Sequence, residues 1–180
     1  SPSIEFAVKN LADKGVNDLL LITLFPHYAM SSYETAVVRV QEVAAKLAPQ
    51  MKVTVQAPYY SAPEYIEALV ASAADFLKHG YDHLLFSFHG IPERHLIKAD
   101  TTGCHCLNAE NCCEVASPAH ATCYRAQCFA TTAAFVKLAG VPKEKYSVSF
   151  QSRLGKDPWL KPYTDYELPR LAQEGKKRML

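Results

Sequence analysis

Residues 84–96 read LLFSFHGIPERHL and contain the pattern that indicates the fold. The stretch opens with five residues, Leu84 to Phe88, of which four are large and apolar. Gly90 and Pro92 then end the apolar run. A short apolar run bounded by turn residues is typical of a buried strand. His89 is therefore expected at the carboxyl end of that strand, where open α/β sheets carry their functional residues.

Similar apolar runs occur on both sides of this stretch. Leu19 to Phe25 (LLLITLF) predicts a strand buried on both faces, and Val53 to Gln56 and Tyr146 to Phe150 predict two shorter strands. The final residues, GKKRML, look like the start of another strand. Strands at these intervals, with helical segments between them, favour α/β architecture with parallel sheets.

The segments between the strands have the 3.6-residue spacing of helices. Apolar residues at helical spacing predict helices over residues 4–14, 33–47, 61–80 and 122–138, and a short one begins near residue 164. Ser61 with Glu64, and Thr164 with Glu167, match the pattern of a capping box at two of these starts.

Composition excludes several classes of protein. The chain has 180 residues, of which 49% are hydrophobic and 21% charged, which is enough apolar mass for a globular core. A net charge of +1 gives no indication of nucleic-acid binding or of attraction to an anionic membrane. The apolar runs stop short of the roughly 20 residues that a membrane-spanning helix needs. The first residues lack a signal-peptide pattern, so a cytoplasmic protein is expected.

Three unusual loops follow predicted strand ends: FPHYAMSSY (25–33), FHGIPERH (88–95) and QSRLGKDPWLKPYTD (151–165). If the strands are parallel neighbours, their carboxyl ends bring these loops to one edge of the sheets. The loops offer aromatic faces, imidazoles and cations, a combination that suits a flat, apolar, anionic ligand.

These same strings resemble the ferrochelatase family, whose members insert ferrous iron into a porphyrin. The resemblance rests on SFHGIPERH, YSVSFQSRLGKDPWLKPYTD and FPHYAMSSYETA, and covers nearly the whole chain. It implies two Rossmann-like lobes of parallel sheets flanked by helices, each only partly represented here. Residues 1–80 would end the first lobe, and residues 81–180 would begin the second, with a Cys-rich insertion at about 98–122.

The resemblance also implies roles for individual residues. His89 matches the histidine that faces the porphyrin centre, where it ligates the metal or accepts a pyrrole proton. Trp159 matches the tryptophan that packs against the macrocycle. Pro26 and Tyr28 match a segment that borders the same cleft. Arg153 matches a basic position that either meets a propionate or braces its loop.

The insertion is rich in cysteine, with five of the six cysteines in residues 104–123. We expect four thiolates there to bind a [2Fe–2S] cluster or zinc, with Cys104, Cys106, Cys113 and Cys123 as ligands and Cys112 as an alternative to Cys113. Idle reduced thiols and disulfides are the alternatives. His105 and His120 are expected to be solvated, unless a zinc site recruits one of them, and Cys128 is expected to pack inside a helix.

Several alternatives remain open at this stage. The family's essential glutamate would lie in a later segment, so this chain is expected to be inactive alone. The competing functions are a Cys-rich structural or electron-transfer module and a cobalt or nickel chelatase. The porphyrin would be protoporphyrin IX or coproporphyrin III, ferrous iron would be the second substrate, and exposed sheet edges would favour a homodimer.

Overall fold

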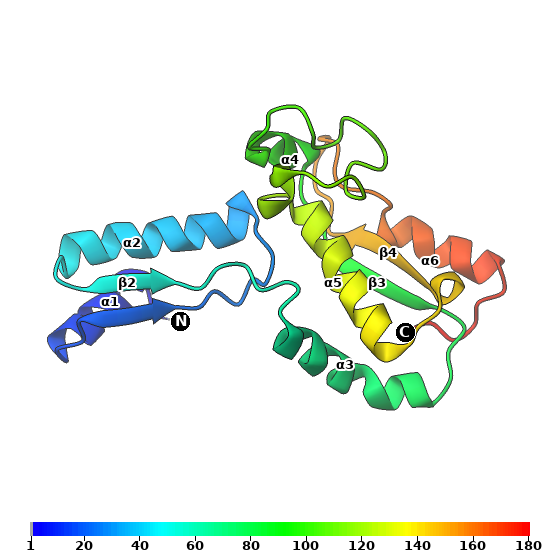
Figure 1. The fold of residues 1–180 in the computed structure, drawn as a ribbon, viewed down its shortest axis with the longest axis horizontal. Helices are drawn as coiled ribbons and strands as arrows, with labels where there is room; N and C mark the ends of the chain where they lie inside the picture. Colours follow the sequence, from blue (N-terminus) through cyan, green and yellow to red (C-terminus); the bar gives the residue numbers. More distant parts are fainter. Residues whose placement is uncertain (1) are drawn as a thin grey trace. The chain divides into compact units, whose positions relative to one another are not determined.

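The computed structural model describes residues 2–180, which fold as two compact units. The first unit runs to Tyr59 and the second spans Tyr60–Leu180. Both contain parallel strands flanked by helices, which confirms the predicted fold class (Figure 1). The units divide at residue 59, whereas the boundary between family lobes is expected near residue 80. The position of that lobe boundary stays a prediction.

The first unit contains two helices, a π-helical turn and a pair of parallel strands. Its elements are α1 (Ile4–Asp13), β1 (Asp18–Leu21), η1 (Met30–Glu34), α2 (Thr35–Leu47) and β2 (Lys52–Val55). The strands pair in register from Asp18 with Lys52 to Leu21 with Val55. The core of this unit is small, because its buried apolar side chains come mainly from α1, α2 and the turn after α2.

The predicted strand over Leu19–Phe25 is wrong in length and in burial. The structure ends β1 at Leu21. Leu24 and Phe25 lie beyond the strand and are 88% and 45% exposed. An apolar run indicates burial only where other elements cover both faces, and within residues 2–180 β1 has a single strand neighbour, β2.

The second unit is larger and surrounds another parallel pair. Its elements are α3 (Pro63–Lys78), β3 (Leu84–His89), α4 (Glu93–Ala99), η2 (Pro118–Ala121), α5 (Tyr124–Ala139), η3 (Lys143–Lys145), β4 (Tyr146–Gln151) and α6 (Thr164–Gln173). The pairing runs from Leu84 with Tyr146 to His89 with Gln151. The strand predicted to end at His89 is therefore confirmed, together with its partner.

Helices cover this strand pair on both faces. On one face, α5 lies across the strands (Figure 1), with the rings of Phe86 and Phe135 in edge contact at 5.2 Å. On the other face, the hydroxyls of Ser87 and Ser149 lie 2.9 and 2.8 Å from that of Thr164, the first residue of α6. The alternation of apolar and hydroxyl side chains along the strands thus assigns each helix to its face.

Both predicted capping boxes are wrong. α3 begins after Ala62 with Pro63 in its first turn, and no side chain caps it. α6 begins after Tyr163, also without a side-chain cap, because the Thr164 hydroxyl bonds to the strands instead. The Glu167 carboxylate pairs with Arg170 at 2.7 Å.

The last residues extend the sheet on the free edge of β3. Met179 forms a parallel bridge with His83, and the Leu180 amide donates to the His83 carbonyl at 3.0 Å. The carboxylate of Asp82 accepts from the amides of Lys177 and Arg178 at 2.8 and 2.9 Å. The expected start of a strand in GKKRML is therefore a parallel neighbour of β3.

The Cys-rich segment after α4 lacks strands and contains one short helical turn, η2. This agrees with the expected irregular loop. Across residues 2–180, none of the helices combines the length and the apolar character that crossing a lipid bilayer requires.

Candidate active site

His89 lies at the carboxyl end of β3 with an exposed side chain. Its Nδ1 lies 2.7 Å from the carbonyl oxygen of Gly90. A carbonyl oxygen only accepts, so this geometry assigns the imidazole proton to Nδ1. The lone pair of the neutral ring is then on Nε2. The His89 carbonyl in turn accepts from the Tyr124 hydroxyl at 2.9 Å, which fixes the strand end against α5.

Gly90 brings the tryptophan loop next to His89. A Cβ atom on Gly90 would lie 2.9 Å from the Gln151 carbonyl oxygen and 3.4 Å from Cε3 of Trp159. The Gly90 amide donates to that same carbonyl at 2.7 Å. Only a residue without a side chain permits this approach. The structure therefore places Trp159 against the residue that follows His89.

Backbone hydrogen bonds hold the Trp159 loop in position. The Glu93 amide donates to the Pro158 carbonyl at 2.9 Å, and the Leu160 amide to the Ile91 carbonyl at 3.1 Å. The indole Nε1 of Trp159 donates to the Leu154 carbonyl at 2.9 Å. Leu160 is 1% exposed and anchors the loop in the core. The half-buried indole ring is thus fixed by its two chain neighbours and by its own nitrogen.

Arg153 contacts residues of its own loop and of α6. Its guanidinium binds the Asp165 carboxylate at 2.8 Å and lies over the rings of Tyr163 and Tyr166, at 4.2 and 4.6 Å from their centroids. The hydrogen bond to Tyr166, followed by the charge of Asp165, raises the pKa of Arg153. Of the two expected roles, these contacts favour bracing, and contact with a propionate stays a prediction.

Pro26 and Tyr28 belong to the first unit. The Pro26 carbonyl accepts from the Tyr59 amide at 2.9 Å. The Tyr28 hydroxyl donates to the Glu34 carboxylate at 2.8 Å, and burial together with that carboxylate raises the pKa of Tyr28 to about 12. Between them, His27 is buried, and desolvation lowers its pKa to about 4. That this loop meets the His89 and Trp159 loops stays a prediction.

Three cysteines of the insertion lie together. The Cys123 thiol forms hydrogen bonds with Cys113 and with Cys106. The bond from Cys113 lowers the pKa of Cys123 to about 6 despite its burial. Burial, followed by the charge of Cys123, raises the pKa of Cys106 to about 12, and the bond with Cys123 raises that of Cys113. Cys123 therefore contacts two of the other preferred ligands, Cys113 and Cys106.

The other two candidate cysteines have different surroundings. Cys104 is exposed, and its Sγ lies 3.9 Å from the Thr102 hydroxyl. Cys112 is buried, with an Arg125 Nη1 at 4.0 Å from its Sγ. In the described part of the chain, residues 2–180, no three His, Cys, Asp or Glu side chains are arranged to hold a metal ion. Cys128, by contrast, is fully buried in α5, as expected of a packing residue.

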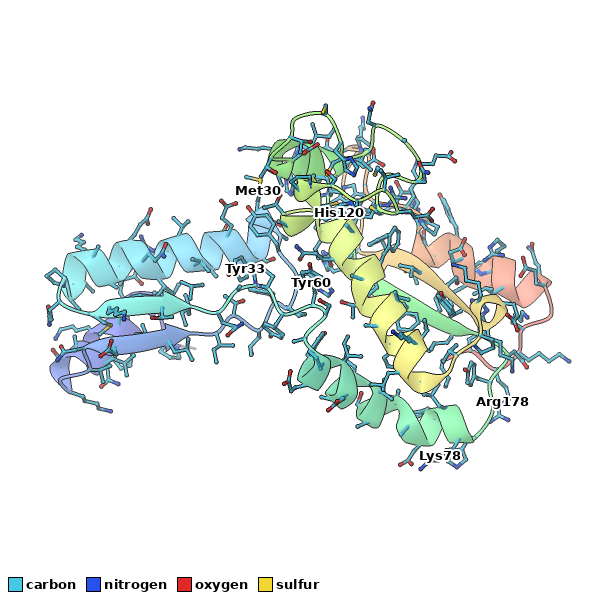
Figure 2. The ribbon with its side chains drawn as sticks, viewed as in Figure 1. Met30, Tyr33, Tyr60, Lys78, His120 and Arg178 are labelled. Carbon is cyan, nitrogen blue, oxygen red and sulfur yellow. The ribbon has the colours of Figure 1, made fainter. Side chains whose placement is uncertain are left out.

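His105 and His120 are not solvated, contrary to expectation. Both are half-buried, and their Nε2 atoms lie 2.7 and 3.1 Å from the carbonyl oxygen of Cys112. Figure 2 shows His120 near the amino end of α5. A carbonyl oxygen has two lone pairs and can accept from both rings. The two imidazoles therefore fix the turn that contains Cys112.

Asp100 organises the start of the insertion, and sequence reasoning missed it. Its carboxylate accepts from the amides of Thr102, His105 and Cys106 at 2.7–2.8 Å and from the Thr102 hydroxyl. These bonds, that from Cys106 first, hold the pKa of Asp100 well below its usual range. An aspartate just before Thr-Thr-Gly is the signature of such a turn and was the available signal.

The similarity of this chain to known proteins extends over its whole length. The family model described as Ferrochelatase matches residues 1–180. A ferrochelatase of Opitutus terrae is 54% identical over 179 residues, covering 99% of this chain and 52% of the relative. A ferrochelatase of Stutzerimonas stutzeri is 47% identical over 180 residues, covering 99% of this chain and 53% of the relative. The chain thus spans about half the length of these curated relatives.

Proposed function

Because the chain belongs to the ferrochelatase family, we propose that it supplies the His89 side of a site that inserts ferrous iron into a porphyrin. The observation that supports this most directly is the exposed imidazole at the end of β3, with Nδ1 bonded to Gly90 and Nε2 left with its lone pair. Ferrous iron and the porphyrin are the substrates. The porphyrin is protoporphyrin IX or coproporphyrin III.

The proposed chemistry needs a base or a ligand at the macrocycle centre. Insertion replaces two pyrrole N–H bonds with bonds to iron, so two protons leave as the metal enters. The free Nε2 lone pair of His89 suits either acceptance of a pyrrole proton or transient ligation of the iron. Its orientation is set before substrate arrives, because the Nδ1 bond fixes the ring.

The neighbouring side chains are proposed to bind the macrocycle. The indole of Trp159, held by its bond to Leu154, offers a flat apolar face beside Gly90. The family resemblance assigns Pro26 and Tyr28 to porphyrin binding as well. Arg153 would act by keeping the loop that carries Trp159 in place, through Asp165.

Steady-state insertion of ferrous iron into a soluble porphyrin tests the proposal. The assay compares this 180-residue chain with a chain extended to the length of the curated relatives. We expect activity in the extended chain, a loss of about 10²–10⁴-fold in its His89→Ala variant, and less than about a tenth of its turnover in the 180-residue chain. The matched control is His79→Ala, a histidine at the end of α3.

Either of two results would contradict parts of this proposal. Full turnover in the His89→Ala variant would remove His89 from the reaction. Turnover in the 180-residue chain of a tenth or more of that of the extended chain would show that no essential group, such as the family's glutamate, lies outside these residues.

The Cys-rich segment is proposed to bind a [2Fe–2S] cluster or zinc. The contacts of Cys123 with Cys106 and with Cys113 support these three as ligands, and Cys104 or Cys112 would complete the set. Metal analysis of anaerobically purified protein is the measurement. Because thiolate sites bind tightly, we expect close to a full equivalent of iron pairs or zinc. The metal should be lost in the Cys123→Ser variant, which removes a proposed ligand, and kept in Cys128→Ser, which does not. Less than about a tenth of an equivalent of both metals would refute the site.

A homodimer and a cytoplasmic location complete the proposal. The exposed apolar residues in and after β1, among them Leu20 and Leu24, support self-association. The six free thiols suit a reducing compartment. Sedimentation velocity tests the dimer, and cell fractionation tests the location.

A further inference from the structure

A groove of about 490 Å³ lies along β4 in the second unit. Its lining contains neither His89 nor Trp159, so it is separate from the proposed porphyrin site, and it borders the cysteine cluster through Cys113. Apolar and aromatic groups of Phe129, Tyr146 and Val148 contribute to its walls. We call it the β4 groove. Its volume is in the usual range of small-molecule pockets, about 300–1,000 Å³.

Three cations line the β4 groove: Arg125, Lys143 and Lys161. Each lies near an aromatic ring, with Arg125 5.3 Å from the centroid of Phe129 and Lys143 5.4 Å from that of Tyr146. Within residues 2–180, none of the three forms an ion pair. The lining includes one carboxylate, that of Glu114. The groove therefore has an excess of positive charge beside aromatic surface.

One hydrogen-bond donor of the lining also lacks a partner. The Nε of Arg125 is buried and has no hydrogen-bond partner. A buried unpaired donor is costly, and an anionic group bound beside Arg125 would offer the acceptor that this nitrogen needs.

We propose that the β4 groove binds a small organic anion that carries two acidic groups on an apolar body. One acidic group would pair with Arg125, the other with Lys143 or Lys161, and the apolar body would lie against Phe129 and Tyr146. Aromatic walls with a few placed cations select such a ligand over an inorganic ion, which cannot use the apolar surface. This inference does not depend on iron insertion at His89.

The test is isothermal titration calorimetry of the 180-residue chain with naphthalene dicarboxylate, naphthalene monocarboxylate and inorganic phosphate. We expect the dicarboxylate to bind most tightly and phosphate not at all. The exposed lysines are the variants of choice, because Lys143→Gln and Lys161→Gln leave the core intact. Each substitution should lower the affinity for the dicarboxylate about tenfold, because it removes one charge-assisted contact. Glu114→Gln should strengthen it, because it removes the one negative charge on the lining.

Matched controls make the result decisive. Lys145→Gln changes a lysine of the same short helix whose ammonium lies over Tyr81 instead, so it should leave affinity unchanged. His89→Ala should also leave it unchanged, which separates this groove from the proposed porphyrin site. Absence of dicarboxylate binding would overturn the inference. So would equal affinity in the lysine variants and the wild type, or binding only to vesicles of anionic lipid.

Discussion

The strand pair β3–β4 and the strand pair β1–β2 share parallel pairing but differ in how they are covered. Helices α5 and α6 cover β3–β4 on its two faces, and Phe150 near the carboxyl end of β4 is 1% exposed. In the first unit, Leu20 in β1 is 58% exposed and Leu24 just beyond it 88%. The covered pair therefore supports His89, at the end of β3, and the loop that contains Trp159. An apolar run thus forms a strand over its whole length only where helices cover both of its faces, as in β3.

Shortening a buried side chain of the covered pair β3–β4 should have the largest effect on stability. Phe150→Ala removes a ring that contacts Phe88 and Phe129 and should cost about 3–5 kcal/mol. Leu20→Ala in β1, which is mostly exposed, should cost far less. Hydrogen exchange followed separately for the amides of each unit measures both variants. Equal losses of stability from the two substitutions would show that the two strand pairs do not differ in how well they are packed.

Acid should destabilise the first unit through His27. Burial lowers the pKa of His27 from its ordinary value of 6.5 to about 4, so the folded state resists protonation that the unfolded state accepts. The stability that the neutral ring contributes is fully present above pH 6.5 and is lost as pH falls toward 4. The linkage amounts to about 3 kcal/mol over that window. Hydrogen exchange of the β1 and β2 amides against pH measures it, and His27→Gln should flatten the slope.

Gly90→Ala should disturb the fixed loop with an intermediate effect. The added methyl would meet the Gln151 carbonyl at 2.9 Å and should cost about 1–3 kcal/mol. It should also move Trp159, the single tryptophan of the chain, so its fluorescence reports the change. Gly140→Ala is the control, because it strains a backbone of positive φ but meets no neighbour within 4 Å, so it should leave Trp159 in place. An unchanged Trp159 emission in Gly90→Ala would show that a side chain at position 90 fits beside Gln151 and Trp159.

The smallest effect is expected beyond β1. Leu24→Ser should change stability by less than about 0.5 kcal/mol, since the side chain is 88% exposed. The same substitution should lower self-association if this apolar segment forms the proposed dimer contact. Sedimentation velocity of wild type and variant distinguishes the two effects. A dimer of unchanged affinity would move the contact elsewhere.

The elements that bear the candidate site could be predicted from local sequence. The run Leu84–Phe88 and the turn after it were enough to place His89 at a strand end, because a buried strand depends on consecutive residues. The helix that ends at Gly140 was likewise predictable, since a left-handed residue closes it. Local patterns therefore determined which elements form.

The hydrogen-bond partners of individual side chains could not be predicted, because they depend on neighbours that are distant in sequence. Thr164 matched a capping box, yet its hydroxyl bonds to Ser87 and Ser149 on the sheet. His105 and His120 looked like solvated loop residues, yet both reach the Cys112 carbonyl. The geometry that brings such groups together exists only after the units have folded.

The pairing of Arg178–Leu180 beside β3 also has a consequence for the order of assembly during synthesis. Asp82 and its partners Lys177 and Arg178 are 95 and 96 positions apart, whereas Leu84 and its partner Tyr146 are closer along the chain. Loop closure costs entropy that grows with the length of the closed loop, and a ribosome releases the chain from its amino end. We therefore expect β3 to pair with β4 first and to remain open on its other edge until residues 178–180 have left the exit tunnel.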